Sequence, residues 1–299
     1  MKILLLTQPM PASPFVTAIR SLAPDLEIVE FRRDLSEAEL ADVEVVLGWQ
    51  MPRGVAGRLP KLRWVCAVAA GVEKLLVEDL AEHVPVSRII DAEQADGIAQ
   101  YVVLMALRHA RALPMYEAQQ RERQWRRSPI AAVRSRVAVL GTGAMGGVVA
   151  RLLGVVGFEV RGWSRANAEP LEALLGESDI VVCALPLTAQ TQGLLDARAF
   201  AAMPRGGYFI NVARGGHVIE ADLVEAVRSG HLGGAALDVQ RHEPMPPDDP
   251  LWDVPGITIT PHIAAQPSVM TIAAQFVDGV RCIERGEPPP QAIDRARGY

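Results

Sequence analysis

The chain contains 299 residues, of which 49% are hydrophobic and 22% are charged. This length favours two domains with separate cores, and this composition excludes an intrinsically disordered protein. The formal net charge of −5 provides no broad positive surface for nucleic acid, and no apolar stretch reaches the length of a membrane span. We therefore expect a cytoplasmic protein that binds neither nucleic acid nor membranes.

The three cysteines are far apart and lie in apolar segments, which is typical of buried thiols in a reducing compartment. Their positions, Cys66, Cys183 and Cys282, include no CxxC pair, and the histidines lack the close spacing of metal ligands. The sequence therefore predicts no metal site.

Four apolar segments alternate with helical patterns between the N-terminus and about residue 96. They cover residues 2–7, 26–31, 43–49 and 64–68, and they predict a small open α/β sheet. A helical pattern then runs from Gly97 to Trp125 with an interruption near Pro114. Its length is suited to a crossing between domains and to an arm that packs on a second subunit.

A glycine-rich motif follows this arm, directly after the apolar strand at residues 137–140. It has the pattern G-x-G-x-x-G and comprises Gly141, Thr142, Gly143, Ala144, Met145 and Gly146. Gly141 permits a tight turn, Gly143 lets the backbone approach a pyrophosphate, and Gly146 lets the helix pack closely on the strand. The helix that follows offers unpaired N–H groups to the anion. A glycine-rich turn without a ligand is the alternative for an isolated motif of this kind.

Three later segments repeat the pattern of an apolar run followed by a turn or helix start, at residues 179–185, 207–212 and 233–239. Such runs are typical of parallel strands covered by helices on both faces. We therefore predict a Rossmann dinucleotide-binding domain over residues 98–264. A helical stretch at 269–285 is too short for a third domain, so we expect it to return to the first.

The predicted fold class is accordingly α/β, with two open parallel sheets. Residues 1–97 and 265–299 form a flavodoxin-like substrate domain, and the cofactor domain is inserted into it. Cofactor and substrate would meet in the cleft between the two domains.

The strand at residues 159–163 ends at Ser164 and Arg165, about twenty residues beyond the glycine motif. An acidic residue at this position binds the ribose 2′-OH of NAD, and the sequence has none. Ser164 can donate a hydrogen bond to a 2′-phosphate and Arg165 can pair with it, which favours NADP(H) over NAD(H). The alternative is an ordinary exposed arginine at a strand end.

Three later strands are followed by polar residues, namely Arg214, Glu243 and His262. Ligands bind at the carboxyl ends of the strands in open α/β sheets, so these three side chains can converge. Taken singly, Arg214 is explained as a surface cation, Glu243 as a solvated turn residue and His262 as a capped or buried histidine. Only the set indicates a catalytic site.

The order of these motifs resembles the D-isomer-specific 2-hydroxyacid dehydrogenase family over nearly the whole chain. The resemblance is carried by Ala70-Gly71-Val72, the glycine motif, Leu185-Pro186-Leu187-Thr188 with Thr191, Asn211 to Gly215, Asp238 to Pro244 with Pro250-Leu251-Trp252, and Pro261-His262. The C-terminal segment 294–299, Trp163-Ser164-Arg165 and Trp49 look most like the glyoxylate/hydroxypyruvate reductase A branch.

The resemblance implies a role for each residue of the set. His262 is the acid/base, Glu243 orients it, and Arg214 holds the substrate carboxylate and polarises the carbonyl. Asp238 is similar to the family residue near the nicotinamide carboxamide, as a binding group. The other cofactor contacts implied are Leu185, Pro186, Thr191, Val212 and Ala213. A homodimer that packs through the arm is implied as well.

The resemblance also implies that backbone N–H groups of Ala69, Ala70 and Gly71 hold the substrate carboxylate. Ala69 stands where the family commonly has glycine, and a methyl group in a loop that needs positive φ would reshape the pocket. Trp49 lines that pocket by analogy, although a tryptophan at a strand end is as often simply packed on the core.

We therefore expect an NADPH-dependent reductase that converts glyoxylate to glycolate and hydroxypyruvate to D-glycerate. Two alternatives remain open at this point. One is a reductase of a bulkier, phenylpyruvate-like 2-oxo acid on the same fold, and the other is a non-catalytic dinucleotide-sensing protein that regulates a partner.

Overall fold

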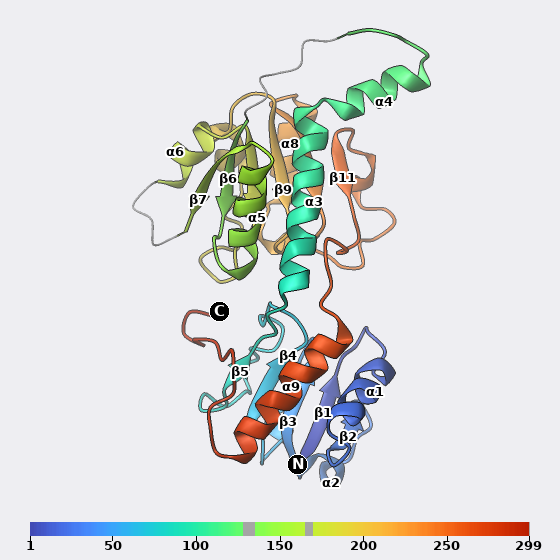
Figure 1. The fold of residues 1–299 in the computed structure, drawn as a ribbon, viewed down its shortest axis with the longest axis vertical. Helices are drawn as coiled ribbons and strands as arrows, with labels where there is room; N and C mark the ends of the chain where they lie inside the picture. The colour runs from blue at the N-terminus through green and yellow to red at the C-terminus, as the bar shows by residue number, and fades with distance from the viewer. Residues whose placement is uncertain (128–134, 165–169, 299) are drawn as a thin grey trace. The chain divides into compact units, whose positions relative to one another are not determined.

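The computed structural model describes residues 1–127, 135–164 and 170–298. The chain divides into two compact units, which are Met1–Asp91 with Pro267–Tyr299, and Ala92–Gln266 (Figure 1). Each unit is built on an open parallel sheet covered by helices, which confirms the predicted fold class.

The first unit has a five-stranded sheet in the order β2-β1-β3-β4-β5. Its strands are β1 Lys2–Leu6, β2 Glu27–Glu30, β3 Val43–Gly48, β4 Trp64–Ala67 and β5 Val86–Ser87. Its helices are α1 Ser13–Leu22, α2 Glu37–Leu40 and α9 Val269–Glu284, with a 3-10 turn at Ala56–Arg58. Four of the strands match predicted segments, whereas β5 has two residues and is too short to show any periodicity.

The C-terminal helix α9 packs against the first sheet. Ile3 and Leu5 of β1 share a core with Phe276 of α9. Leu4 and Leu6 belong to the core on the other face of the sheet, because side chains alternate along a strand. Phe276 stacks on Trp64 of β4 with 5.3 Å between the ring centroids. The tail of the chain is therefore part of the same unit as its first strands.

The second unit has a six-stranded sheet in the order β11-β10-β9-β8-β6-β7. Its strands are β6 Arg136–Leu140, β7 Glu159–Trp163, β8 Ile180–Cys183, β9 Gly207–Asn211, β10 Leu232–Leu237 and β11 Ile257–Ile259. The chain runs outward from β6 to β7 and then continues on the opposite side of β6 with β8. This reversal is the switch point at which doubly wound sheets bind ligands.

Helices cover both faces of the second sheet. They are α3 Ala92–Ala110, α5 Ala144–Val155, α6 Leu171–Gly176, α7 Ala197–Ala202 and α8 Glu220–Arg228, with 3-10 turns at Gly215–His217 and Pro250–Asp253. Helix α4 Leu113–Arg121 follows α3 and has no buried residue. Val137 and Val139 of β6 pack with residues of α3 and α5, which lie side by side in Figure 1. Ala138 and Leu140 face the core on the other side, which the alternation along a buried strand requires.

The predicted arm consists of two helices. Helix α3 begins at Ala92, five residues before the predicted start at Gly97, and α4 begins just before Pro114. Between them Ala112 has a φ of 50°, which turns the chain where the pattern is interrupted. None of the described helices is long and apolar enough to cross a membrane.

Candidate functional site

The predicted site residues of the second unit follow the carboxyl ends of parallel strands. The glycine motif follows β6, Pro186 follows β8, Arg214 follows β9, Glu243 follows β10 and His262 follows β11. Because neighbouring strands in this sheet are parallel, these loops lie along one edge of it.

The glycine motif has the close contacts and the open space that a pyrophosphate site needs. A Cβ on Gly141 would lie 2.6 Å from the carbonyl oxygen of Ala184, at the end of β8, and Gly141 has a φ of 95°. A Cβ on Gly146 would lie 1.7 Å from the carbonyl oxygen of Gly141, whereas one on Gly143 would meet nothing within 4 Å. The motif is thus tightly packed at its two ends and open at Gly143, where a phosphate group could approach the backbone.

Helix α5 starts at this loop without a side-chain cap and without an acidic residue in its first turn. Thr142, Gly143 and Ala144 are exposed, while Met145 is half-buried. The first N–H groups of a helix and its dipole favour an anion. The residues present therefore fit the diphosphate of a dinucleotide.

Strand β7 ends beside the glycine motif. A Cβ on Gly162 would lie 2.5 Å from the methyl carbon of Thr142, so a glycine at this position lets β7 approach the loop. Ser164, the first residue after β7, is half-buried. Arg165 lies outside the described residues.

The structure brings Glu243 and His262 together. The Nδ1 atom of His262 lies 3.0 Å from Oε2 of Glu243, and the side chains are 32% and 27% exposed. The other oxygen of Glu243 accepts a hydrogen bond of 3.1 Å from the backbone N–H of Gln240. The carboxylate is thus oriented by its own loop and in turn orients the imidazole ring of His262.

His262 has a φ of 55°, in the left-handed region that residues other than glycine rarely adopt. Its backbone N–H donates to the carbonyl oxygen of Asp238 at 2.8 Å. The next two N–H groups, of Ile263 and Ala264, donate to the two carboxylate oxygens of Asp238, each at 2.9 Å. Asp238, a predicted cofactor contact, is 2% exposed and holds the turn that carries His262.

The arginine turn packs against the loop that carries Glu243. A Cβ on Gly215, the residue after Arg214, would lie 2.0 Å from the backbone carbon of Gln240. The carbonyl oxygen of Arg214 accepts hydrogen bonds from Nδ2 of Asn211 and faces Nδ1 of His217, both at 3.0 Å. Arg214 is half-buried, and its guanidinium donates to the carbonyl oxygen of Ala213 at 2.7 Å.

Several predicted cofactor contacts shape loops with their side chains. Thr191 is 1% exposed and donates its hydroxyl to the carbonyl oxygen of Pro186 at 2.7 Å. Leu185 and Ala213 are buried in the core of the unit, and Val212 is half-buried. Side-chain contacts from Thr191, Leu185 and Ala213 to a cofactor are therefore limited.

The predicted carboxylate loop lies in the first unit, directly after β4. Ala69, Ala70 and Gly71 are half-buried, and Ala69 is not among the residues with positive φ. The expected conflict between its methyl group and a left-handed backbone is therefore wrong. Trp49 is half-buried against the core of this unit, and the ammonium of Lys74 lies 4.8 Å from its ring centroid.

Two residues without an assigned role join the site. Thr260 donates its hydroxyl to Asp238 at 2.6 Å, and the hydroxyl of Tyr101 lies 2.8 Å from that of Thr260. Burial raises the pKa of Tyr101, and the charge of Asp238 adds to this, while the hydrogen bond with Thr260 opposes it. Thr260 lies next to the Pro261-His262 pair, but nothing in the sequence marks Tyr101.

Comparisons with known proteins point to one family. The family model for the D-isomer specific 2-hydroxyacid dehydrogenase NAD binding domain matches residues 103–264. The chain is 33% identical over 306 residues to glyoxylate/hydroxypyruvate reductase A of Yersinia enterocolitica, with 96% of each chain covered.

Two solved structures resemble the whole chain. A D-isomer specific 2-hydroxyacid dehydrogenase from Xanthobacter autotrophicus, in complex with NADPH and MES, is 37% identical with a TM-score of 0.90, covering 100% of this chain and 99% of that one. An NADPH-dependent glyoxylate/hydroxypyruvate reductase from Sinorhizobium meliloti, in complex with NADP and sulfate, is 30% identical with the same TM-score and the same coverage.

Proposed function

The chain belongs to the D-isomer specific 2-hydroxyacid dehydrogenase family and is an oxidoreductase, and we propose that it uses NADPH to reduce small 2-oxo acids, glyoxylate and hydroxypyruvate first. The observation that carries the proposal is the contact between Glu243 and His262 at 3.0 Å, on the sheet edge that also bears the glycine motif.

The reaction needs a hydride at the carbonyl carbon and a proton at the carbonyl oxygen. Reduced nicotinamide supplies the hydride when it is bound. His262 supplies the proton from Nε2, because Nδ1 faces Glu243. Glu243 stabilises the imidazolium and fixes the ring, so that the donating atom keeps its direction.

Arg214 binds the substrate carboxylate and polarises its carbonyl. A guanidinium is suited to this role because its N–H groups match the two oxygens of a carboxylate. The tight packing of Gly215 on Gln240 keeps the arginine turn next to the loop of Glu243. The N–H groups of Ala69, Ala70 and Gly71 and the ring of Trp49 are the proposed substrate contacts of the first unit.

NADPH is the proposed cofactor because no acidic residue follows β7, where Ser164 and Arg165 stand instead. The similarity to two proteins crystallised with NADPH and NADP supports this choice. Gly141 to Gly146 bind the diphosphate, and Asp238, with the loops at Leu185, Pro186, Thr191, Val212 and Ala213, borders the nicotinamide.

The test is the initial rate of cofactor oxidation by the purified protein. NADPH and NADH are each compared with glyoxylate, hydroxypyruvate, pyruvate and phenylpyruvate, and His262→Ala serves as the inactive control. Fastest NADPH consumption with one of the first two acids supports the proposal, and preference for phenylpyruvate reassigns the substrate. Absence of turnover with every acid, while NADPH still binds, contradicts an enzymatic role.

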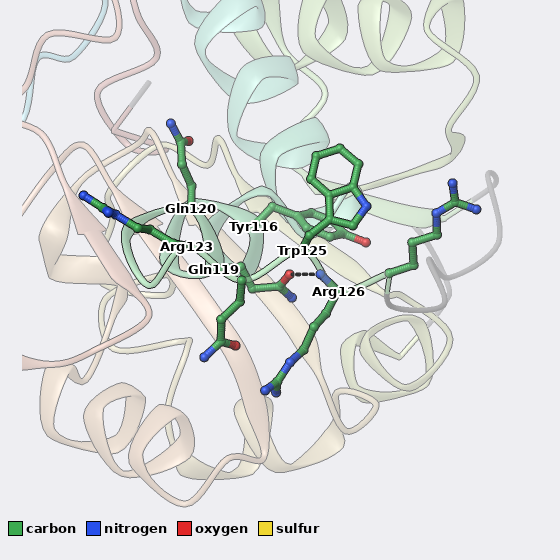
Figure 2. Close-up of a pocket in the computed structure, with 8 residues that line it drawn as sticks. Tyr116, Gln119, Gln120, Arg123, Trp125 and Arg126 are labelled. Carbon is green, nitrogen blue, oxygen red and sulfur yellow. Dashed lines mark hydrogen bonds between the residues drawn. The ribbon is translucent and has the colours of Figure 1, made fainter.

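We also propose a homodimer that packs through the arm formed by α3 and α4. Apolar side chains are exposed along it, with Leu104 57% and Trp125 94% exposed. A pocket at α4, shown in Figure 2, is lined by Tyr116, Gln119, Gln120, Arg123, Gln124, Trp125, Arg126 and Arg127. None of these residues belongs to the strand-end loops, and we include the pocket in the proposed contact surface.

The dimer is tested by light scattering after size-exclusion chromatography. A dimer in the wild type that dissociates in Leu104→Glu supports the proposal, because a buried charge without a partner opposes association. A monomeric wild type, or a variant that stays dimeric, contradicts it.

A further inference from the structure

A chain of hydrogen bonds connects helix α3 to the turn that carries His262. It begins at the hydroxyl of Tyr101, passes through the hydroxyl of Thr260 at 2.8 Å, and reaches the carboxylate of Asp238 after a further 2.6 Å. Tyr101 is 9% exposed and Asp238 is 2% exposed, so both ends of this series of hydrogen bonds are shielded from water. Hydrogen bonds in such surroundings are costly to leave unmade.

The direction of these hydrogen bonds follows from the number of protons. An ionised carboxylate only accepts, and the single hydroxyl proton of Thr260 is donated to Asp238. The hydroxyl of Tyr101 must therefore donate to Thr260. Both hydroxyl groups act toward the same end, which is to hold the carboxylate of Asp238 in place.

Asp238 in turn holds the His262 turn. Its carboxylate accepts from the backbone N–H groups of Ile263 and Ala264, and its own carbonyl oxygen accepts from that of His262. A left-handed residue other than glycine is strained and persists only where its surroundings hold it. The φ of 55° at His262 is therefore maintained by contacts that converge on Asp238.

We propose that Tyr101 and Thr260 are positioning residues for the acid/base His262, and that they act by fixing Asp238 and through it the left-handed turn. The inference rests on the proposed function, because it assigns the relay to the acid/base step of that reaction. Neither residue touches the reacting atoms, so their removal affects how often the imidazole stands in its productive direction.

The chain contains a matched control for this relay. Tyr208 of β9 is also buried, and the side chain of Thr258 on β11, two residues before Thr260, acts on its hydroxyl. Tyr208→Phe and Thr258→Val remove the same chemical groups within the same unit without removing a hydrogen bond of Asp238. Tyr101→Phe and Thr260→Val remove the relay, and Thr260→Ser restores its hydroxyl.

Two readouts are measured on the full chain. The first is kcat and KM for the best 2-oxo acid at saturating NADPH. The second is the rate at which diethyl pyrocarbonate modifies His262, followed by peptide mass spectrometry, which requires no turnover. The unfolding temperature of each variant is recorded alongside.

We expect Tyr101→Phe to lower kcat about three- to tenfold, the factor that the loss of one hydrogen bond produces, with KM nearly unchanged. Thr260→Val should cost about tenfold or more, because it leaves both Tyr101 and Asp238 without their partner. Both variants should also change the modification rate of His262 by at least about twofold. Thr260→Ser and the two control variants should stay close to the wild type in both readouts.

Three results would overturn the relay. They are wild-type values of both readouts in Tyr101→Phe and Thr260→Val, an equal loss in Thr260→Ser, and an equal loss in the control variants. If the wild type turns over no 2-oxo acid, the proposed function fails while the modification rate still tests whether the relay holds His262.

Discussion

Replacement of Glu243 by glutamine removes one negative charge beside His262 and little else. The two side chains are 3.0 Å apart, at which distance opposite charges attract by about 5 kcal/mol at an effective dielectric constant of about 20. Both are close to one-third exposed, so solvent screens most of this energy. The net difference between a charge-assisted and a neutral hydrogen bond is about 1.5 kcal/mol, or roughly tenfold.

The lost charge should slow the chemical step. Without the carboxylate the imidazolium is less stable and the ring is held less firmly, so proton transfer from His262 is slower. We expect 2-oxo acid reduction by Glu243→Gln to be slower by about tenfold, with NADPH binding little changed.

The assay is steady-state reduction of glyoxylate with NADPH, with the dissociation constant of NADPH measured by fluorescence. Glu220→Gln is the matched control, because Glu220 also carries a carboxylate next to this loop, where it accepts a 2.8 Å hydrogen bond from the backbone N–H of Arg241. Wild-type turnover in Glu243→Gln, or an equal loss in Glu220→Gln, would refute the reasoning.

The remaining predictions concern the cofactor, the glycine motif and the thiols. Arg165→Ala should weaken NADPH binding more than NADH binding in titrations of both cofactors, and equal losses would remove Arg165 as the phosphate contact. Gly146→Ala should lower the unfolding temperature by several degrees, because its Cβ would lie 1.7 Å from a carbonyl oxygen, whereas Gly143→Ala should leave it unchanged and weaken cofactor binding alone. Burial raises the pKa of Cys183 to about 12, so iodoacetamide should label the partly exposed Cys282 in the native protein and Cys183 only after unfolding, as read by mass spectrometry.

The strands that place the site could be predicted because their signals are local. Each buried strand of the second unit is a short apolar run with its own turn or helix start, and the glycine motif carries its packing requirements within six residues. The positions of Arg214, Glu243 and His262 after three such runs then follow from parallel pairing. The ends of the helices are predicted less exactly than their existence. Helix α3 begins at Ala92, five residues before the predicted start at Gly97.

Local sequence patterns therefore predict the α/β class, the glycine loop and the set of polar residues at the strand ends. How these residues meet depends on the packed fold, since Glu243 and His262 are 19 positions apart and come together through the pairing of β10 with β11. Three further features also depend on the packed fold. They are the left-handed backbone of His262, the hydrogen bond of the Thr191 hydroxyl with Pro186, and the link from Tyr101 to Asp238. Each depends on contacts between segments that are distant in the chain, and the pattern within one segment carries no information about them.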